Sequence, residues 1–133
     1  MLLDGTFTFI RGDNMSGNYP YVNNYTDDLE LPKGWEDVSY HNDALPSWMT
    51  SSNQQVGYHV WIDSWDIEER KNNAKHIYGI KDEEVLPPRF HVVLGYGASE
   101  NLFMSNDLSE VVEWVKNNPK TKEQLKQTEE ECY

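Results

Sequence analysis

Three stretches of the chain alternate between apolar and polar residues, as a half-buried β-strand does. They are residues 58–63 (YHVWID), 89–95 (RFHVVLG) and 101–105 (NLFMS). Each stretch predicts a strand, and the turn-forming residues between the second and third predict a hairpin. A weaker alternation at 6–10 (TFTFI) predicts a further strand.

Two later segments favour helices. Leu108, Val111, Val112 and Val115 recur at the spacing of one helix face, so the sequence predicts a helix over 107–117 with Ser105 or Asn106 as its N-cap. The residues that follow Ser64 predict a less regular helix, with Ser64 as N-cap, acidic residues first and basic residues later.

These elements predict an α+β fold. We expect an antiparallel sheet of three to five strands, with one main helix at 107–117 packed on one face and a long irregular N-terminal segment. The covered face should carry Tyr58, Val60, Ile62, Phe90, Val92 and Leu94, because a short hairpin needs an apolar partner. Residues 1–118 are expected to form a single domain, and 119–133 a charged tail that is frayed or partly helical.

The segment 18–48 has no long periodicity and interleaves aromatic with acidic residues. A disordered tail would be poor in aromatic residues, so we expect an ordered but irregular segment whose rings hold it in place. The polar stretch 49–57 (MTSSNQQVG) is expected to be a flexible loop.

Composition suggests a soluble cytoplasmic protein. Cys132 is the only cysteine, so an intrachain disulfide is excluded. The first residues have no basic start and no small-residue cleavage site, so a signal peptide is not expected. No apolar run reaches the length of about 20 residues that a membrane helix needs.

Charge is the strongest global signal. The formal net charge is −12, and residues 1–67 account for −8 of it, with ten acidic and two basic residues. Such a field repels nucleic-acid phosphates and anionic membranes and attracts a basic protein. The alternative is that acidity serves solubility alone.

The acidic and aromatic residues of the irregular segment are the best candidates for a contact surface. Tyr and Trp are favoured interface anchors, and carboxylates pair with Arg or Lys of a partner. The candidate binding residues are Tyr21, Tyr25, Asp27, Asp28, Glu30, Trp35, Glu36, Asp37, Tyr40, Asp43 and Trp48. The alternative is that these rings only pack an irregular segment onto the sheet.

A second set of residues suggests metal chemistry. If the strands at 58–63 and 89–95 pair, His59, Trp61, Asp63 and His91 share the sheet face away from the helix. Together with His41 and Asp43, these imidazoles and carboxylates could hold a divalent metal in a hydrolase. The spacing matches no established metal or nucleotide motif.

The sequence therefore favours a non-enzymatic acidic binding module without a cofactor. Its expected partner is a basic protein, such as a nucleic-acid-binding protein, and one form would be an inhibitor that mimics nucleic acid, as phages and mobile elements encode. A metal-assisted hydrolase is the alternative. A third possibility is a small-molecule pocket lined by Trp61, Trp65 and Tyr96.

Overall fold

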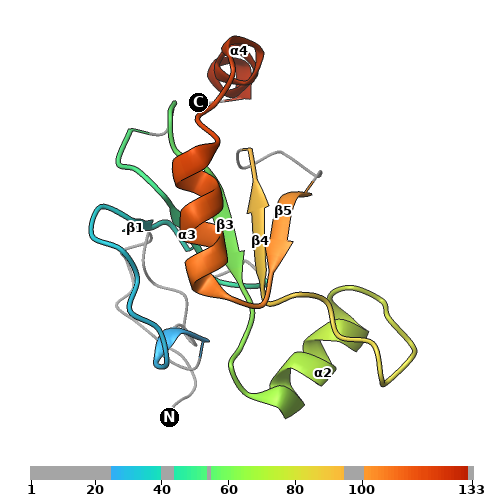
Figure 1. Ribbon diagram of the computed structural model, residues 1–133. Helices are drawn as coiled ribbons and strands as arrows, with labels where there is room; N and C mark the ends of the chain where they lie inside the picture. The colour runs from blue at the N-terminus through green and yellow to red at the C-terminus, as the bar shows by residue number, and fades with distance from the viewer. Residues whose placement is uncertain (1–24, 40–43, 54, 95–100, 132–133) are drawn as a thin grey trace, which may run out of the picture.

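The computed structural model describes residues 25–39, 44–53, 55–94 and 101–131. Five strands form one antiparallel sheet in the order β1-β2-β3-β4-β5, so each strand pairs with its neighbour in sequence. The strands are β1 (Glu36–Asp37), β2 (Ser47–Met49), β3 (His59–Ile62), β4 (Phe90–Val93) and β5 (Asn101–Ser105). The helices are α2 (Ile67–His76), α3 (Leu108–Asn117) and α4 (Lys122–Glu131). The expected α+β class is confirmed, with α3 lying across one face of the sheet (Figure 1).

The apolar core lies between the sheet and α3. The register aligns Trp48, Val60, Val92 and Phe103 in one row across four strands. Val111 of α3 is fully buried against the sheet, and all six residues expected on the covered face belong to this core. The alternation of the sequence therefore predicted the correct face.

Strand β2 corrects the sequence analysis. The sequence predicts an irregular segment and a flexible loop at Ser47 to Met49, but these residues pair with β3 and all three are buried. Three consecutive buried residues leave no alternation by which a strand could be recognised. The strand expected at 6–10 lies outside the described residues.

Helices α2 and α3 each begin at an aspartate, not at the N-caps that the sequence predicts. Asp66 is the N-cap of α2, where its carboxylate accepts a hydrogen bond from the Glu69 amide at 3.2 Å. Asp107 is the N-cap of α3 and accepts from the Ser109 amide at 2.9 Å. Ser64 is instead buried, just before the first turn of α2.

The end of α3 is fixed to the sheet by a tyrosine. The Tyr58 hydroxyl donates to the carbonyl oxygen of Asn118 at 2.6 Å, and its ring meets Trp114 edge-on at 5.2 Å between centroids. Burial raises the pKa of Tyr58, so its hydroxyl remains a donor at neutral pH. Beyond this point α4 lies past the end of α3, away from the sheet (Figure 1).

Candidate interaction surface

Residues 25–39 run beside the sheet and end in its edge strand β1, and we call this stretch the acidic segment. It contains five acidic residues and one base, Lys33. One bend is a turn in which the Trp35 amide donates to the Pro32 carbonyl at 3.2 Å, with Gly34 at a φ of 95°. A positive φ at the third position of a turn requires glycine or a similarly tolerant residue, so the PKGW sequence fixes this bend.

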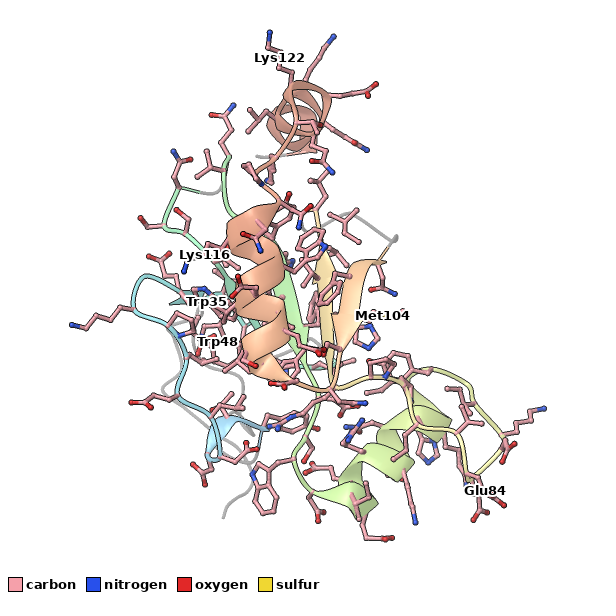
Figure 2. The ribbon with its side chains drawn as sticks, in the orientation of Figure 1. Trp35, Trp48, Glu84, Met104, Lys116 and Lys122 are labelled. Atoms are coloured by element: carbon pink, nitrogen blue, oxygen red, sulfur yellow. The ribbon has the colours of Figure 1, made fainter. Side chains whose placement is uncertain are left out.

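Apolar side chains hold the acidic segment against the molecule. Leu29, Leu31 and Trp35 are partly buried and pack on the core between the sheet and α3. Trp35 and Trp48 lie close to α3 in Figure 2. At the far end of the segment, the Ser39 hydroxyl accepts from the Ser47 amide at 3.0 Å, which ties the segment to β2. The segment is therefore anchored along its length.

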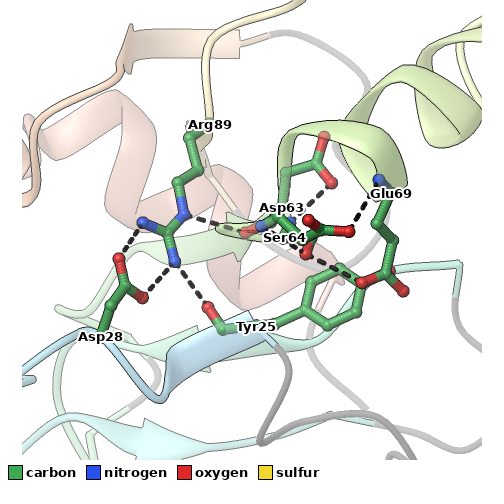
Figure 3. Close-up of polar contacts among 7 residues, drawn as sticks. Tyr25, Asp28, Asp63, Ser64, Glu69 and Arg89 are labelled. Carbon is green, nitrogen blue, oxygen red and sulfur yellow. Dashed lines mark hydrogen bonds and ion pairs between the residues drawn. The ribbon is translucent and has the colours of Figure 1, made fainter.

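Arg89 connects the acidic segment to the edge of the core. Its guanidinium donates two hydrogen bonds of 2.7 Å to the two carboxylate oxygens of Asp28, and one of 2.7 Å to the Tyr25 carbonyl (Figure 3). Its Nε donates to the Asp63 carbonyl at 3.0 Å. Arg89 is buried, so this bidentate pair is a fixed structural contact.

A second set of hydrogen bonds joins the same region to α2. The Asn73 amide nitrogen donates to the Asp63 carboxylate at 2.8 Å and to the Tyr25 hydroxyl at 3.1 Å. The carboxylate of Glu69 accepts from the Ser64 hydroxyl at 2.9 Å and from the Tyr25 hydroxyl at 3.3 Å. Tyr25 is thus held by polar contacts as well as by its buried ring (Figure 3).

The pairing with Arg89 changes the ionisation of Asp28. The hydrogen bond from Arg89 lowers the pKa of the Asp28 carboxyl, against a smaller opposing effect of burial, and the Arg89 charge lowers it further. Asp28 therefore stays ionised at any pH above its ordinary range. Its charge is partly neutralised by Arg89 and is less available to a partner than a free carboxylate would be.

The structure separates the candidate binding residues into two groups. Tyr25 and Trp48 are 3% and 6% exposed, so these rings lie in the core and not at a surface that a partner could contact. Their burial follows from contacts distant in sequence, since Tyr25 packs with Leu45 and Trp48 with the sheet core. Trp35 is half-buried for the same reason.

The carboxylates take the opposite orientation. Exposed members of the set are Asp27, Asp28, Glu30 and Glu36, and Asp37 is half-buried. The acidic segment therefore presents acidic side chains outward and apolar ones inward. Tyr21, Tyr40 and Asp43 lie outside the described residues.

The metal alternative gains no support from the described residues. Strands β3 and β4 pair as expected, and His59 and His91 lie on the same face. Trp61 is the direct neighbour of His91, and its ring centroid lies 4.6 Å from that of His59 in a tilted arrangement. The Asp63 carboxylate accepts a hydrogen bond from the Asn73 side chain of α2. Across the parts of the chain that are described, no three His, Cys, Asp or Glu side chains are grouped so that they could hold a metal. His41 and Asp43 lie outside those parts.

Sequence reasoning missed the anchoring residues. Arg89, Asn73 and Glu69 were not selected, although together they position the acidic segment. The signal in the sequence that could have identified Arg89 is a basic residue at the start of an apolar strand. Of the residues proposed for a small-molecule pocket, Trp61 lines a cavity, Trp65 is 49% exposed and Tyr96 lies outside the described residues.

Compared with protein-family models, with curated proteins and with solved structures, the chain has no match in any of the three. No helix in the described ranges combines the length and the apolar character that crossing a membrane requires.

Proposed function

We propose that this chain is a non-enzymatic binding module that docks on a basic protein surface through the outward carboxylates of the acidic segment. The observation that carries the proposal is the division of that segment into inward Leu29, Leu31 and Trp35 and outward acidic side chains. A segment held in this way offers charges in fixed positions, which lowers the entropy that binding costs.

Charge supports a cationic partner. The acidic segment has a formal net charge of −4, from five acidic residues and Lys33, within a chain of −12. Opposite charge raises the rate of encounter and selects among partners, whereas phosphates and anionic membranes are repelled. A partner that itself binds nucleic acid is the natural class, because its surface already carries the arginines and lysines that carboxylates would meet. Occupation of that surface would make the chain an inhibitor that mimics nucleic acid.

A capture experiment with matched variants tests the proposal. One variant, D27N/E30Q/E36Q, removes three exposed charges from the acidic segment, and the other, E83Q/E84Q/E123Q, removes three exposed charges elsewhere. Both raise the formal net charge from −12 to −9, since each loses three negative charges. Asp28 is left unchanged because of its pairing with Arg89.

The wild-type chain is immobilised on a support and incubated with a lysate of its source cells. It is expected to retain a basic protein at about 50 mM salt and to release it by about 300 mM salt, because salt screens the surface charges. The control variant should retain the same protein, and the acidic-segment variant should lose it. Equal loss in both variants would mean that net charge alone governs capture. Retention that does not change with salt would also contradict the proposal.

A further inference from the structure

A cavity lies on the face of the sheet opposite α3. Its volume is about 300 Å³, at the lower end of the range for small-molecule pockets. The aromatic side chains that line it are Trp61, Tyr78 and His91, from β3, the chain after α2, and β4. Strand pairing places Trp61 directly beside His91, and the Tyr78 ring stacks on His91 with centroids 5.5 Å apart.

The lining residues become more exposed from the floor of the cavity to its rim. Leu45, Val93 and His91 are buried and form the floor. The aromatic rings of Trp61 and Tyr78 are half-buried, whereas Ala44 at the rim is exposed. An apolar floor with aromatic walls favours a flat apolar ligand, because rings pack face-to-face or edge-to-face with other rings.

His91 supplies a defined polar group in this apolar setting. Its Nε2 lies 2.7 Å from the Pro88 carbonyl oxygen, and because a carbonyl oxygen only accepts, Nε2 carries the hydrogen. In the neutral ring Nδ1 is then an acceptor. Among the described residues none donates to Nδ1. A ligand with an N–H or O–H group would satisfy it.

Tyr78 keeps its hydroxyl hydrogen throughout the physiological range. Burial and the negative charge of Asp63 raise the pKa of Tyr78 to about 12, with Arg70 opposing them. The lining therefore combines a neutral phenol with the imidazole of His91, and it contains no lysine or arginine. An anionic ligand would find no counter-charge here and would be repelled by the acidic chain.

We infer that this cavity binds a neutral, flat aromatic molecule of one or two rings that donates a hydrogen bond to Nδ1 of His91. The aromatic walls would cover the faces of the ligand, and the single acceptor would set its orientation. The inference is independent of the proposed docking function, because none of the lining residues belongs to the acidic segment.

Ligand-observed fluorine NMR tests this inference with a fluoroindole as the probe. Indole has two fused rings and one N–H donor, and the fluorine signal is not obscured by the five tryptophans of the chain. Saturable line broadening is expected. The corresponding fluorobenzothiophene, which keeps the shape but lacks the donor, should bind about tenfold more weakly, because the acceptor of His91 is left unsatisfied.

Two variants of the cavity and one control variant test whether the probe binds in this cavity. Ala44→Trp fills the cavity from its exposed rim and should abolish binding, and Trp61→Ala removes one wall and should weaken it at least tenfold. Trp65→Ala removes an exposed ring outside the lining and should leave binding unchanged. Near-ultraviolet circular dichroism of each variant verifies that the fold is retained.

Absence of saturable binding to the wild-type chain would overturn the inference. So would binding that survives Ala44→Trp in a folded variant, because the probe would then occupy another site. Equal affinity for fluoroindole and fluorobenzothiophene would show that His91 does not accept a hydrogen bond from the ligand. The inferred ligand class would then be wrong.

Discussion

Arg89 and Asp28 form the contact on which the position of the acidic segment depends. Arg89 is buried, and it donates to the Asp28 carboxylate and to two backbone carbonyls from separate parts of the chain. Removal of the carboxylate would leave a buried guanidinium without its counter-charge. The adjacent Asp27 is exposed and makes no such contact with the residues described, so the pair offers a matched comparison.

We predict that Asp28→Asn lowers the free energy of unfolding by about 1–2 kcal/mol at pH 7, since the carboxylate is partly exposed and solvent screens part of the interaction. Asp27→Asn should change it by less than about 0.5 kcal/mol. Urea denaturation of both variants measures the difference. Equal stability of the two would show that the Arg89 pair does not anchor the segment.

The same pair predicts a dependence on pH. Arg89 lowers the folded-state pKa of Asp28 below its ordinary value of 3.8, so its stabilising effect is fully present above that value and is lost as the pH falls through the lowered pKa. The stability difference between wild type and Asp28→Asn should therefore be constant from pH 7 to about pH 5 and shrink below about pH 4. Urea denaturation across this range measures it, and a constant difference down to pH 2 would contradict the assignment.

Helix α3 covers the sheet with a different apolar stripe from the one its sequence predicts. The α3 residues in the core are Leu108, Val111, Trp114 and Val115, whereas Val112 is half-buried and lies outside the cluster. The spacing predicts that Leu108, Val111, Val112 and Val115 share one face, but contact with the sheet covers Trp114 and not Val112. The sequence gives the period, and packing selects the residues.

We predict that Val111→Ala lowers the free energy of unfolding by about 2 kcal/mol, from two lost buried methyl groups and the cavity that remains. The same substitution at Val112 should cost less than about 1 kcal/mol, because that side chain is only partly removed from water. Thermal or urea unfolding of the two variants checks the order. A larger effect at Val112 would contradict the packing of α3.

Sequence patterns were sufficient to predict the strands and the helix whose apolar residues alternate or repeat regularly, namely β3, β4, β5 and α3. They failed at β2, where Trp48 and both neighbours are buried and no alternation exists. They also failed for the burial of Tyr25, which depends on Leu45 and Tyr78 far along the chain. The acidic side chains were recognisable from sequence, but their outward orientation required the fold.

At the scale of the whole molecule, one sheet separates two surfaces of different chemistry. One sheet face is covered by α3, and Leu29, Leu31 and Trp35 of the acidic segment pack against the same core, whereas Tyr25 packs with Leu45. The other face carries the cavity lined by Trp61, Tyr78 and His91. The two features share no residue, so a partner protein and a small molecule would meet different parts of the chain.

The most direct test of the docking proposal is to map where a basic polypeptide contacts the chain. A short oligolysine peptide, added to the isotope-labelled protein at about 50 mM salt, is predicted to shift the backbone amide signals of residues 26–37 most strongly. The shifts should largely disappear at about 300 mM salt. Shifts centred on the exposed acids at 82–84, or spread evenly over the surface, would contradict the account.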